Sequence, residues 1–201
     1  MSTFPAEFSN AIRALHDPIP VIRGDADRVR WFPRLIRPEI RRTMLALLET
    51  RFSPLIRRVA RAVEPETITG MTRNYSEALP KSLRNSTVFL NSPRSAAFQS
   101  ARECGLTGFL TSPSLQQFAE RVSGFALERS PGMQVICYKP GDYVGPHNDH
   151  HPEDAHLRDG YVDLQITLTN DDVERQYLLY ECGGFFNRSV NVGISSGVSV
   201  S

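Results

Sequence analysis

The sequence contains few cysteines and no long apolar run. Its three cysteines, Cys104, Cys137 and Cys182, are odd in number and widely spaced, which argues against a disulfide framework and against a Cys-x-x-Cys zinc or redox site. We expect them to be reduced and mostly buried. No apolar run approaches the roughly 20 residues that cross a bilayer, and residues 1–10 lack a basic segment followed by an apolar one. These absences predict a cytoplasmic protein with no membrane partner.

The charge is nearly balanced overall but unevenly distributed. The formal net charge is +1, yet residues 1–62 contain 12 arginines and 6 acidic residues, whereas residues 141–201 contain 3 arginines and 10 acidic residues. The N-terminal arginines lie at helical spacing among apolar residues, without the aromatic side chains that stack on nucleic-acid bases. We therefore predict a solvated helix face, no nucleic-acid partner, and attraction between the two oppositely charged regions.

The chain suits a single domain, 1–201, because 201 residues with 40% hydrophobic content can form a sizeable core. Helical periodicity dominates residues 1–130, which are expected to form a mainly helical outer layer with early strands. Within 131–201 apolar and polar residues alternate, as is typical of half-buried strands. Helices followed by antiparallel strands predict an α+β domain in which the N-terminal helices pack outside a β-sandwich or jelly roll.

Three helices and several strands are predicted. The first two helices occupy 40–48 and 55–63, where apolar residues recur at three- and four-residue steps, and a Ser-Pro step at Ser53 divides them. The third covers 114–127 and begins at a capping box that starts with Ser114. The predicted strands cover residues 87–90, 135–138, 162–168, 176–181, 190–194 and 198–200.

Residues 135–149 carry the strongest functional signal. A strand leads through Tyr138 and a Pro-Gly turn to the pair His147-x-Asp149. Side chains two positions apart in extended backbone project to the same side, so this imidazole and this carboxylate can reach one divalent cation. Iron(II) in oxygen-activating enzymes is commonly held by two histidines and one carboxylate, with positions open for cosubstrate and dioxygen. The pair therefore predicts two of the three protein ligands of such a site.

This arrangement resembles the iron(II)/2-oxoglutarate-dependent dioxygenase superfamily, most closely its prolyl-4-hydroxylase-like branch. The resemblance covers roughly residues 133–200 and implies a double-stranded β-helix, which is a cupin-like jelly roll. It implies that His147 and Asp149 bind iron(II), and that Tyr138 contacts the cosubstrate 2-oxoglutarate. It also implies an oxygenase that hydroxylates a small-molecule or peptidyl substrate.

The chain departs from the family pattern in its last segment. Family members carry a second histidine on a later strand, followed by a basic residue that pairs with the far carboxylate of 2-oxoglutarate. Residues 157–201 contain no histidine, and the last arginine is Arg188. We therefore expect the closing strands to be absent and the chain to be a truncated or degenerate member. The alternative is a non-catalytic, cupin-like protein that binds a ligand or partner.

Other interpretations of these residues remain open or fail. Asp149-His150 is like the ligand pair of helical metal phosphohydrolases, but Gly145 and Pro152 oppose a long helix. A metallo-β-lactamase-like site needs a histidine where this chain has Gly145, so it stays the weaker alternative. Tyr138 is equally compatible with a core aromatic whose hydroxyl bonds to backbone. Either a solvated acidic loop or a replacement ligand accounts for the remaining local histidines, His150, His151 and His156.

Overall fold

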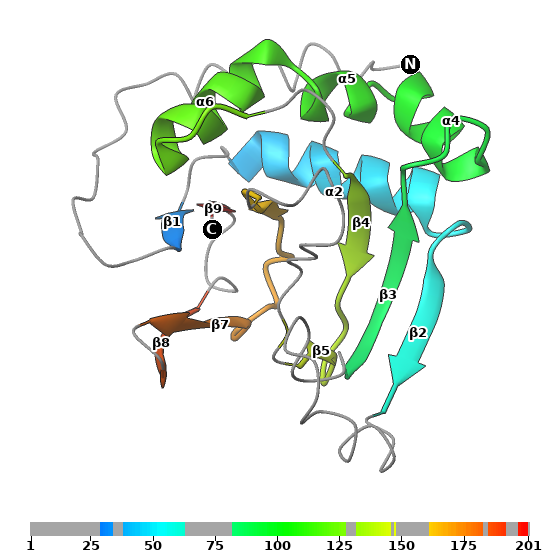
Figure 1. Cartoon of the computed structure of the whole chain (residues 1–201). Coiled ribbons are helices and arrows are strands. Elements are labelled where there is room, and N and C mark those ends of the chain that lie inside the picture. Colours follow the sequence, from blue (N-terminus) through cyan, green and yellow to red (C-terminus); the bar gives the residue numbers. More distant parts are fainter. Residues whose placement is uncertain are drawn as a thin grey trace, which may run out of the picture.

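The computed structural model describes residues 29–33, 38–62, 82–127, 132–145, 147, 161–182, 185–191 and 197–200, and these form α-helices and antiparallel strands (Figure 1). The helices are α2 (Pro38–Phe52), α4 (Ala96–Glu103), α5 (Leu106–Leu110) and α6 (Pro113–Ser123). The strands are β1 (Arg30–Pro33), β2 (Arg57–Arg61), β3 (Leu83–Phe89), β4 (Gln134–Cys137), β5 (Tyr143–Val144), β6 (Leu164–Thr167), β7 (Tyr177–Cys182), β8 (Phe185–Asn191) and β9 (Gly197–Val200).

The described strands form three antiparallel sheets. In the first, β9 lies between β1 and β6, with Val198 opposite both Phe32 and Ile166. In the second, β3 lies between β2 and β4, and β5 pairs with the beginning of β3. The third sheet consists of β7 and β8. Helices combined with antiparallel sheets confirm the α+β class that the sequence predicts.

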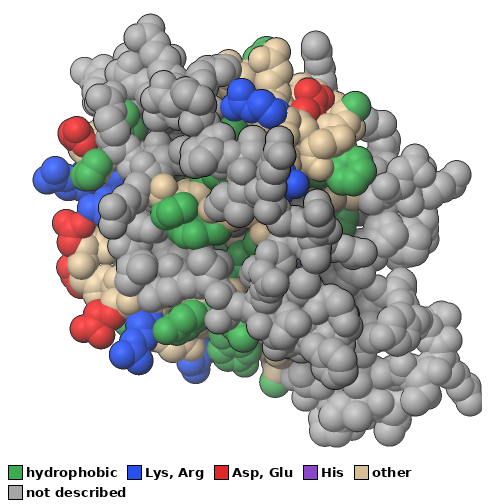
Figure 2. All heavy atoms as spheres, turned by 90° about the vertical axis from the view of Figure 1, so that its left-hand side faces the viewer, with side chains coloured by type: hydrophobic (Ala, Val, Ile, Leu, Met, Phe, Trp, Pro, Cys, Tyr) green, Lys and Arg blue, Asp and Glu red, His purple; other side chains and the backbone are tan. Residues whose placement is uncertain are grey.

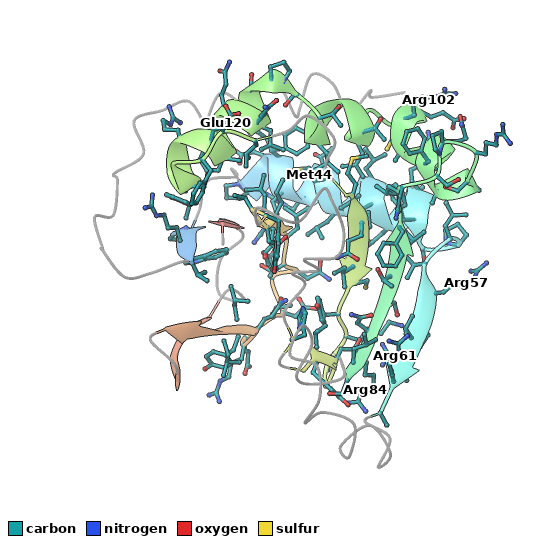
Figure 3. The ribbon with its side chains drawn as sticks, in the orientation of Figure 1. Met44, Arg57, Arg61, Arg84, Arg102 and Glu120 are labelled. Atoms are coloured by element: carbon teal, nitrogen blue, oxygen red, sulfur yellow. The ribbon has the colours of Figure 1, made fainter. Side chains whose placement is uncertain are left out.

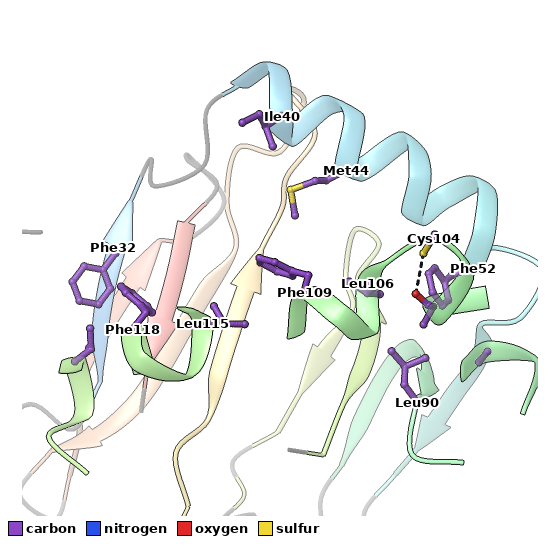
Figure 4. Close-up of a cluster of buried hydrophobic side chains, with 13 residues drawn as sticks. Phe32, Ile40, Met44, Phe52, Leu90, Cys104, Leu106, Phe109, Leu115 and Phe118 are labelled. Atoms are coloured by element: carbon purple, nitrogen blue, oxygen red, sulfur yellow. Dashed lines mark hydrogen bonds between the residues drawn. The ribbon is translucent and has the colours of Figure 1, made fainter. Parts of the chain in front are cut away.

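The hydrophobic core lies where the four helices cover the sheets (Figures 1 and 4). Phe118 of α6 meets Phe32 of β1 edge to face, with ring centroids 5.7 Å apart. Val88 and Val135 of one sheet and Ile166 of another pack against the same cluster, so both sheets bury one face here. The buried core residues are Phe32, Ile40, Met44, Phe52, Leu90, Ala97, Ala101, Cys104, Leu106, Phe109, Leu115, Phe118 and Val122.

Local sequence signals explain where α6 begins and ends. Ser112 is its N-cap, because the Ser112 side-chain oxygen accepts a hydrogen bond from the Leu115 amide at 3.3 Å, and Pro113 occupies the first helical position. Gly124 ends the helix with φ +81°, a left-handed conformation that suits glycine. The prediction of a helix was therefore confirmed, but the capping box that starts with Ser114 was wrong.

The segment after α2 is a strand, where the sequence pattern predicted a second helix over 55–63. A turn follows the end of α2, with the Ile56 amide donating to the Phe52 carbonyl at 2.8 Å. β2 then pairs with β3 along its whole length, and Val59 is its one half-buried side chain. The helix-like spacing arose because apolar residues of a turn and of an alternating strand fell at three-residue steps. Pairing with β3 satisfies the backbone and decides the conformation.

Two findings concern the cysteines and the apolar character of the helices. Cys104 and Cys137 are free thiols, Cys104 buried and Cys137 exposed. The expectation of mostly buried cysteines is therefore wrong for Cys137, which is the last residue of β4 and lies where the chain leaves the sheet. None of the helices in the described ranges combines the length and the apolar character needed to cross a bilayer.

Oppositely charged regions of the sequence meet in the structure. Arg41 of α2 forms an ion pair with Asp171, in the turn after β6, and Arg58 of β2 forms one with Asp142, just before β5. Both pairs join the basic N-terminal region to the acidic C-terminal region, as the charge distribution predicts. On the face of the molecule shown in Figure 2, acidic and basic side chains likewise lie close together.

Candidate functional site

The segment that leads to the predicted metal ligands leaves the sheet in a short excursion. β4 and β5 pair with the same edge of β3, where Cys137 lies opposite Ser86 and Tyr143 lies opposite Arg84. A single β3 residue, Asn85, therefore faces residues 138–142. Because one residue cannot pair with five, this part of the chain must fold away from the ladder as a loop.

The excursion is built around a tight turn. The Asp142 amide donates to the Lys139 carbonyl at 2.9 Å, which closes a four-residue turn. Pro140 occupies the second position, where its ring fixes a suitable φ, and Gly141 occupies the third with φ +77°. These are the residues that a type II turn favours, so the Pro-Gly pair is needed for the backbone path.

Asp142 ties this turn to the neighbouring strands. The Asp142 carboxylate accepts two hydrogen bonds from Arg58, with Nη1–Oδ2 and Nη2–Oδ1 distances of 2.6 and 2.5 Å, and a third from the Lys139 amide at 2.8 Å. Its side chain is only 1% exposed. The hydrogen bonds from Arg58 are the main cause that lowers the pKa of Asp142, to about 2. The carboxylate is therefore ionised throughout the neutral range.

A second arginine holds the same turn from the central strand. Arg84 donates from Nε to the Gly141 carbonyl at 3.1 Å, and its Nε lies 3.7 Å from Asp142 Oδ1. Its guanidinium also lies over the Tyr143 ring, 5.7 Å from the centroid. Figure 3 shows Arg84 at the end of the β2–β3 pair that lies away from the helices. The guanidinium groups of Arg58 and Arg84 thus hold the turn against β2 and β3, respectively.

The loop is fastened again just before His147. The Gly145 amide donates to the Ser82 carbonyl at 2.7 Å, and a Cβ atom at position 145 would lie only 2.5 Å from the Ser82 hydroxyl oxygen. His147 then contacts the Gly145 carbonyl through Nδ1 at 2.8 Å. Position 145 therefore has no room for the histidine that a metallo-β-lactamase-like site requires.

The His147 contact determines which ring nitrogen suits a metal. A carbonyl oxygen can only accept a hydrogen bond, so Nδ1 must carry the proton, and in the neutral ring the lone pair is then on Nε2. Metal-bound histidines commonly donate their other ring N–H to a backbone carbonyl in this way. The exposed ring of His147 thus fits the chemistry of a metal ligand.

Tyr138 stands at the beginning of the same loop. Its side chain is 40% exposed, and burial of the hydroxyl raises the pKa of Tyr138, while a hydrogen bond with the Asn85 side chain opposes that rise. Asn85 is 4% exposed, and its Oδ1 finds no hydrogen-bond partner among the described residues. The Asn85 side chain therefore influences the Tyr138 hydroxyl, which the sequence did not suggest.

The structure describes part of the predicted metal site. Tyr138 and His147 flank the turn, whereas Asp149 and the histidines at positions 150, 151 and 156 lie outside the described residues. The described ranges contain no group of three or more His, Cys, Asp or Glu side chains that could hold a metal ion. Sequence reasoning missed Arg58, Arg84 and Asn85, because nothing in their local sequence distinguishes them from other strand residues.

Comparisons with known proteins add no relative to this description. Neither models of protein families, nor curated proteins, nor solved structures gave a match to the chain. The interpretation of the site therefore depends on its own residues and contacts, chiefly on the loop between Tyr138 and His147 and on the arginines that fasten it.

Proposed function

We propose that this protein is an iron(II)/2-oxoglutarate-dependent oxygenase in which His147 and Asp149 bind iron and Tyr138 contacts 2-oxoglutarate. The observation that carries the proposal is the His147 ring, held through Nδ1 by the Gly145 carbonyl at the end of a fastened loop. Bound iron and 2-oxoglutarate together supply oxygen activation, in which 2-oxoglutarate loses CO₂ and becomes succinate while a substrate C–H bond gains an oxygen atom. The protein's own contribution is to hold the ligands in place.

The arrangement of the sheets supports a double-stranded β-helix as the finer description of the fold. The helices cover one side of the β1–β9–β6 and β2–β3–β4 sheets, and β7 and β8 pair with each other apart from both. A jelly roll is built from antiparallel strands arranged in two sheets. The antiparallel pairing of the late strands, β6 with β9 and β7 with β8, is the feature that supports this proposal.

One face of the β2–β3–β4 sheet supports binding of an organic substrate. Val88 and Val135 pack against the helices, so the alternating residues on both strands face the opposite way. There Phe89 is 59% exposed and Ile136 36% exposed. Tyr138, just after the end of β4, is 40% exposed. Exposed apolar side chains beside a tyrosine hydroxyl suit a small-molecule or peptidyl substrate with an apolar part.

We also place the protein in the cytoplasm. Cys137 is an exposed free thiol and Cys104 a buried one. Oxidising compartments favour disulfides, and an exposed unpaired thiol persists most readily where glutathione keeps thiols reduced. Fractionation of cells that express the tagged protein tests this placement directly, since recovery in a secreted or membrane fraction would contradict it.

Metal titration tests the proposed ligand. Calorimetry with Mn(II) in place of iron(II) should show binding that His147→Ala removes and that His16→Ala, a histidine outside the motif, leaves unchanged. We expect weak binding, because residues 157–201 supply no second histidine. A missing histidine removes one bond to the metal and also the hydrogen bonds that would orient that ligand. Unchanged binding in His147→Ala would place the metal elsewhere.

Turnover separates an enzyme from its non-catalytic alternative. The protein is incubated with iron(II), ascorbate, O₂ and 2-oxoglutarate, and succinate is followed over time. Succinate formation that depends on His147 supports an oxygenase, and one of the histidines at 150, 151 and 156 then becomes the first candidate for a replacement ligand. Metal binding through His147 without succinate identifies instead a cupin-like protein that binds a ligand or partner without turnover.

A further inference from the structure

We propose that Arg58 and Asp142 are positioning residues for the metal-binding loop, because their ion pair holds the 139–142 turn and thereby sets the place of His147 relative to the sheet. The inference depends on the proposed function, since it takes His147 as a metal ligand. Neither residue is proposed to touch metal, cosubstrate or substrate. Their effect on the site passes through the backbone between the turn and the imidazole.

The ion pair crosses the middle strand of its sheet. Arg58 lies on β2 opposite Ser86 of β3, and Ser86 in turn lies opposite Cys137 of β4. The Arg58 guanidinium therefore reaches over β3 to the turn that follows β4, where it meets Asp142 with two hydrogen bonds. Two parallel hydrogen bonds between planar groups fix direction as well as distance. The turn can then not slide along the sheet without breaking them.

The described residues between this ion pair and the imidazole are held by contacts with β3 and its neighbouring residues. After Asp142 comes β5, whose two residues pair with Leu83 and Arg84 of β3. Gly145 follows, bonded through its amide to the Ser82 carbonyl, and its own carbonyl holds His147 at 2.8 Å. We therefore expect a movement of the turn to displace the Gly145 carbonyl and, with it, the imidazole.

The ion pair lies outside the parts of the molecule that supply most stability. The core gathers beneath the helices, whereas Asp142 comes just before β5, which pairs with the end of β3 that lies away from α4 and α5 (Figure 1). The Arg58 side chain is 46% exposed and that of Asp142 1% exposed, and neither residue belongs to the hydrophobic core cluster. Loss of the pair should therefore loosen the loop while the core and the β2–β3 ladder stay intact.

The experiment compares Asp142→Asn and Arg58→Gln with a matched control. Asn at 142 keeps the shape and can still accept from the Lys139 amide, but it loses the charge that Arg58 needs. Arg57→Gln removes a neighbouring exposed arginine that donates instead to the Pro54 carbonyl at 3.0 Å. Mn(II) affinity is measured at a temperature where all variants are folded by circular dichroism.

We expect about tenfold weaker Mn(II) binding in Asp142→Asn and Arg58→Gln, the usual effect of losing a residue that orients a metal ligand, and no change in Arg57→Gln. Arg58→Lys should recover part of the loss, because one ammonium donor replaces two parallel guanidinium donors. In metal-free protein, hydrogen exchange of the Gly145 amide should become faster in the two variants, while the β2–β3 ladder amides exchange as in the wild type.

The outcomes separate this inference from the proposed function. If His147→Ala removes Mn(II) binding but Asp142→Asn and Arg58→Gln bind as tightly as the wild type with unchanged Gly145 exchange, the positioning role is wrong and the metal ligand stands. If His147→Ala binds normally, the proposed function fails, and the exchange rate at Gly145 alone decides whether the ion pair holds the loop. Equal loss in Arg57→Gln would show a general charge effect and would also overturn the positioning role.

Discussion

Gly145 and Ser82 approach each other so closely that only glycine fits at position 145. The Gly145 amide donates to the Ser82 carbonyl at 2.7 Å, and a Cβ atom built on Gly145 would lie 2.5 Å from the Ser82 hydroxyl oxygen and 3.1 Å from its carbonyl oxygen. A hydroxyl can rotate away from a methyl group, but the carbonyl belongs to backbone next to β3. Contact with Ser82 thus fixes where the loop turns toward His147.

Replacing Gly145 with alanine should separate the loop from Ser82. We expect Gly145→Ala to lower the free energy of unfolding by about 1–3 kcal/mol, the usual cost of forcing an extra carbon into a packed position. Urea denaturation followed by circular dichroism measures it. Gly132→Ala is the matched control, because a Cβ there meets nothing within 4 Å. Equal effects of the two substitutions would show that the contact with Ser82 is not what selects glycine.

The start of α6 offers a direct comparison between two neighbouring serines. Ser112→Ala removes the side-chain oxygen that accepts from the Leu115 amide, and it should cost about 1 kcal/mol. Ser114→Ala, one residue inside the helix, should change stability by less than about 0.5 kcal/mol. Chemical denaturation of both variants checks this. A larger loss in Ser114→Ala would restore the capping box that the sequence suggested.

This pair of serines shows what local sequence could and could not predict. The apolar spacing of α6 predicted a helix, because burying one face at 3.6-residue periodicity is a local property. The predicted N-cap of the helix was two residues too late. Both Ser112 and Ser114 could serve as the N-cap, and Pro113, which favours the first helical position, makes Ser112 the cap. α4 and α5 were not predicted, although Ser95 caps α4 in the same way, because their residues lie in a stretch of mixed signals.

Strands were harder to predict where their partners are distant in sequence. The alternating pattern of β6 was recognised in the sequence, but its partners were not. β6 pairs with β9, and β9 pairs in turn with β1, which begins at Arg30, 134 positions before the start of β6. β2 was taken for a helix because apolar residues of the preceding turn and of the strand fall at helical spacing. In both cases pairing with a strand far away in the sequence determines the conformation. The local sequence pattern does not show which strands will pair.

The same limit applies to the candidate site. The Pro-Gly turn and His147 were predicted, because turn chemistry and ligand spacing are local. The charge asymmetry predicted attraction between the ends of the chain, and the ion pairs Arg58–Asp142 and Arg41–Asp171 confirm it. Which arginine meets which aspartate depends on the sheet register, so the sequence could not identify Arg58. The iron, the cosubstrate and the role of Tyr138 stay predictions.

Packing between α6 and β1 should carry much of the stability. Phe118 is 2% exposed and meets Phe32 edge to face. Phe118→Ala should therefore lower the free energy of unfolding by about 3–5 kcal/mol, through lost burial and the cavity that remains. Phe125→Ala removes a ring that is 67% exposed, so it should change stability by less than about 0.5 kcal/mol. Urea denaturation of both variants measures the contrast, and similar losses would contradict the assignment of the core.

The last prediction concerns pH. Hydrogen bonds from Arg58 hold the pKa of Asp142 at about 2, below its ordinary value of 3.8, so the folded protein favours the ionised carboxylate more than the unfolded chain does. The stability that this gives is fully present above about pH 4 and is lost as the pH falls toward 2. Asp142→Asn has no such carboxylate, so its free energy of unfolding should fall less steeply than that of the wild type between pH 4 and 2. Arg58→Gln removes the main cause of the shift and should likewise flatten this fall. Urea denaturation at several pH values tests both variants, and parallel curves for the wild type and Asp142→Asn would show that the carboxylate gains nothing from Arg58.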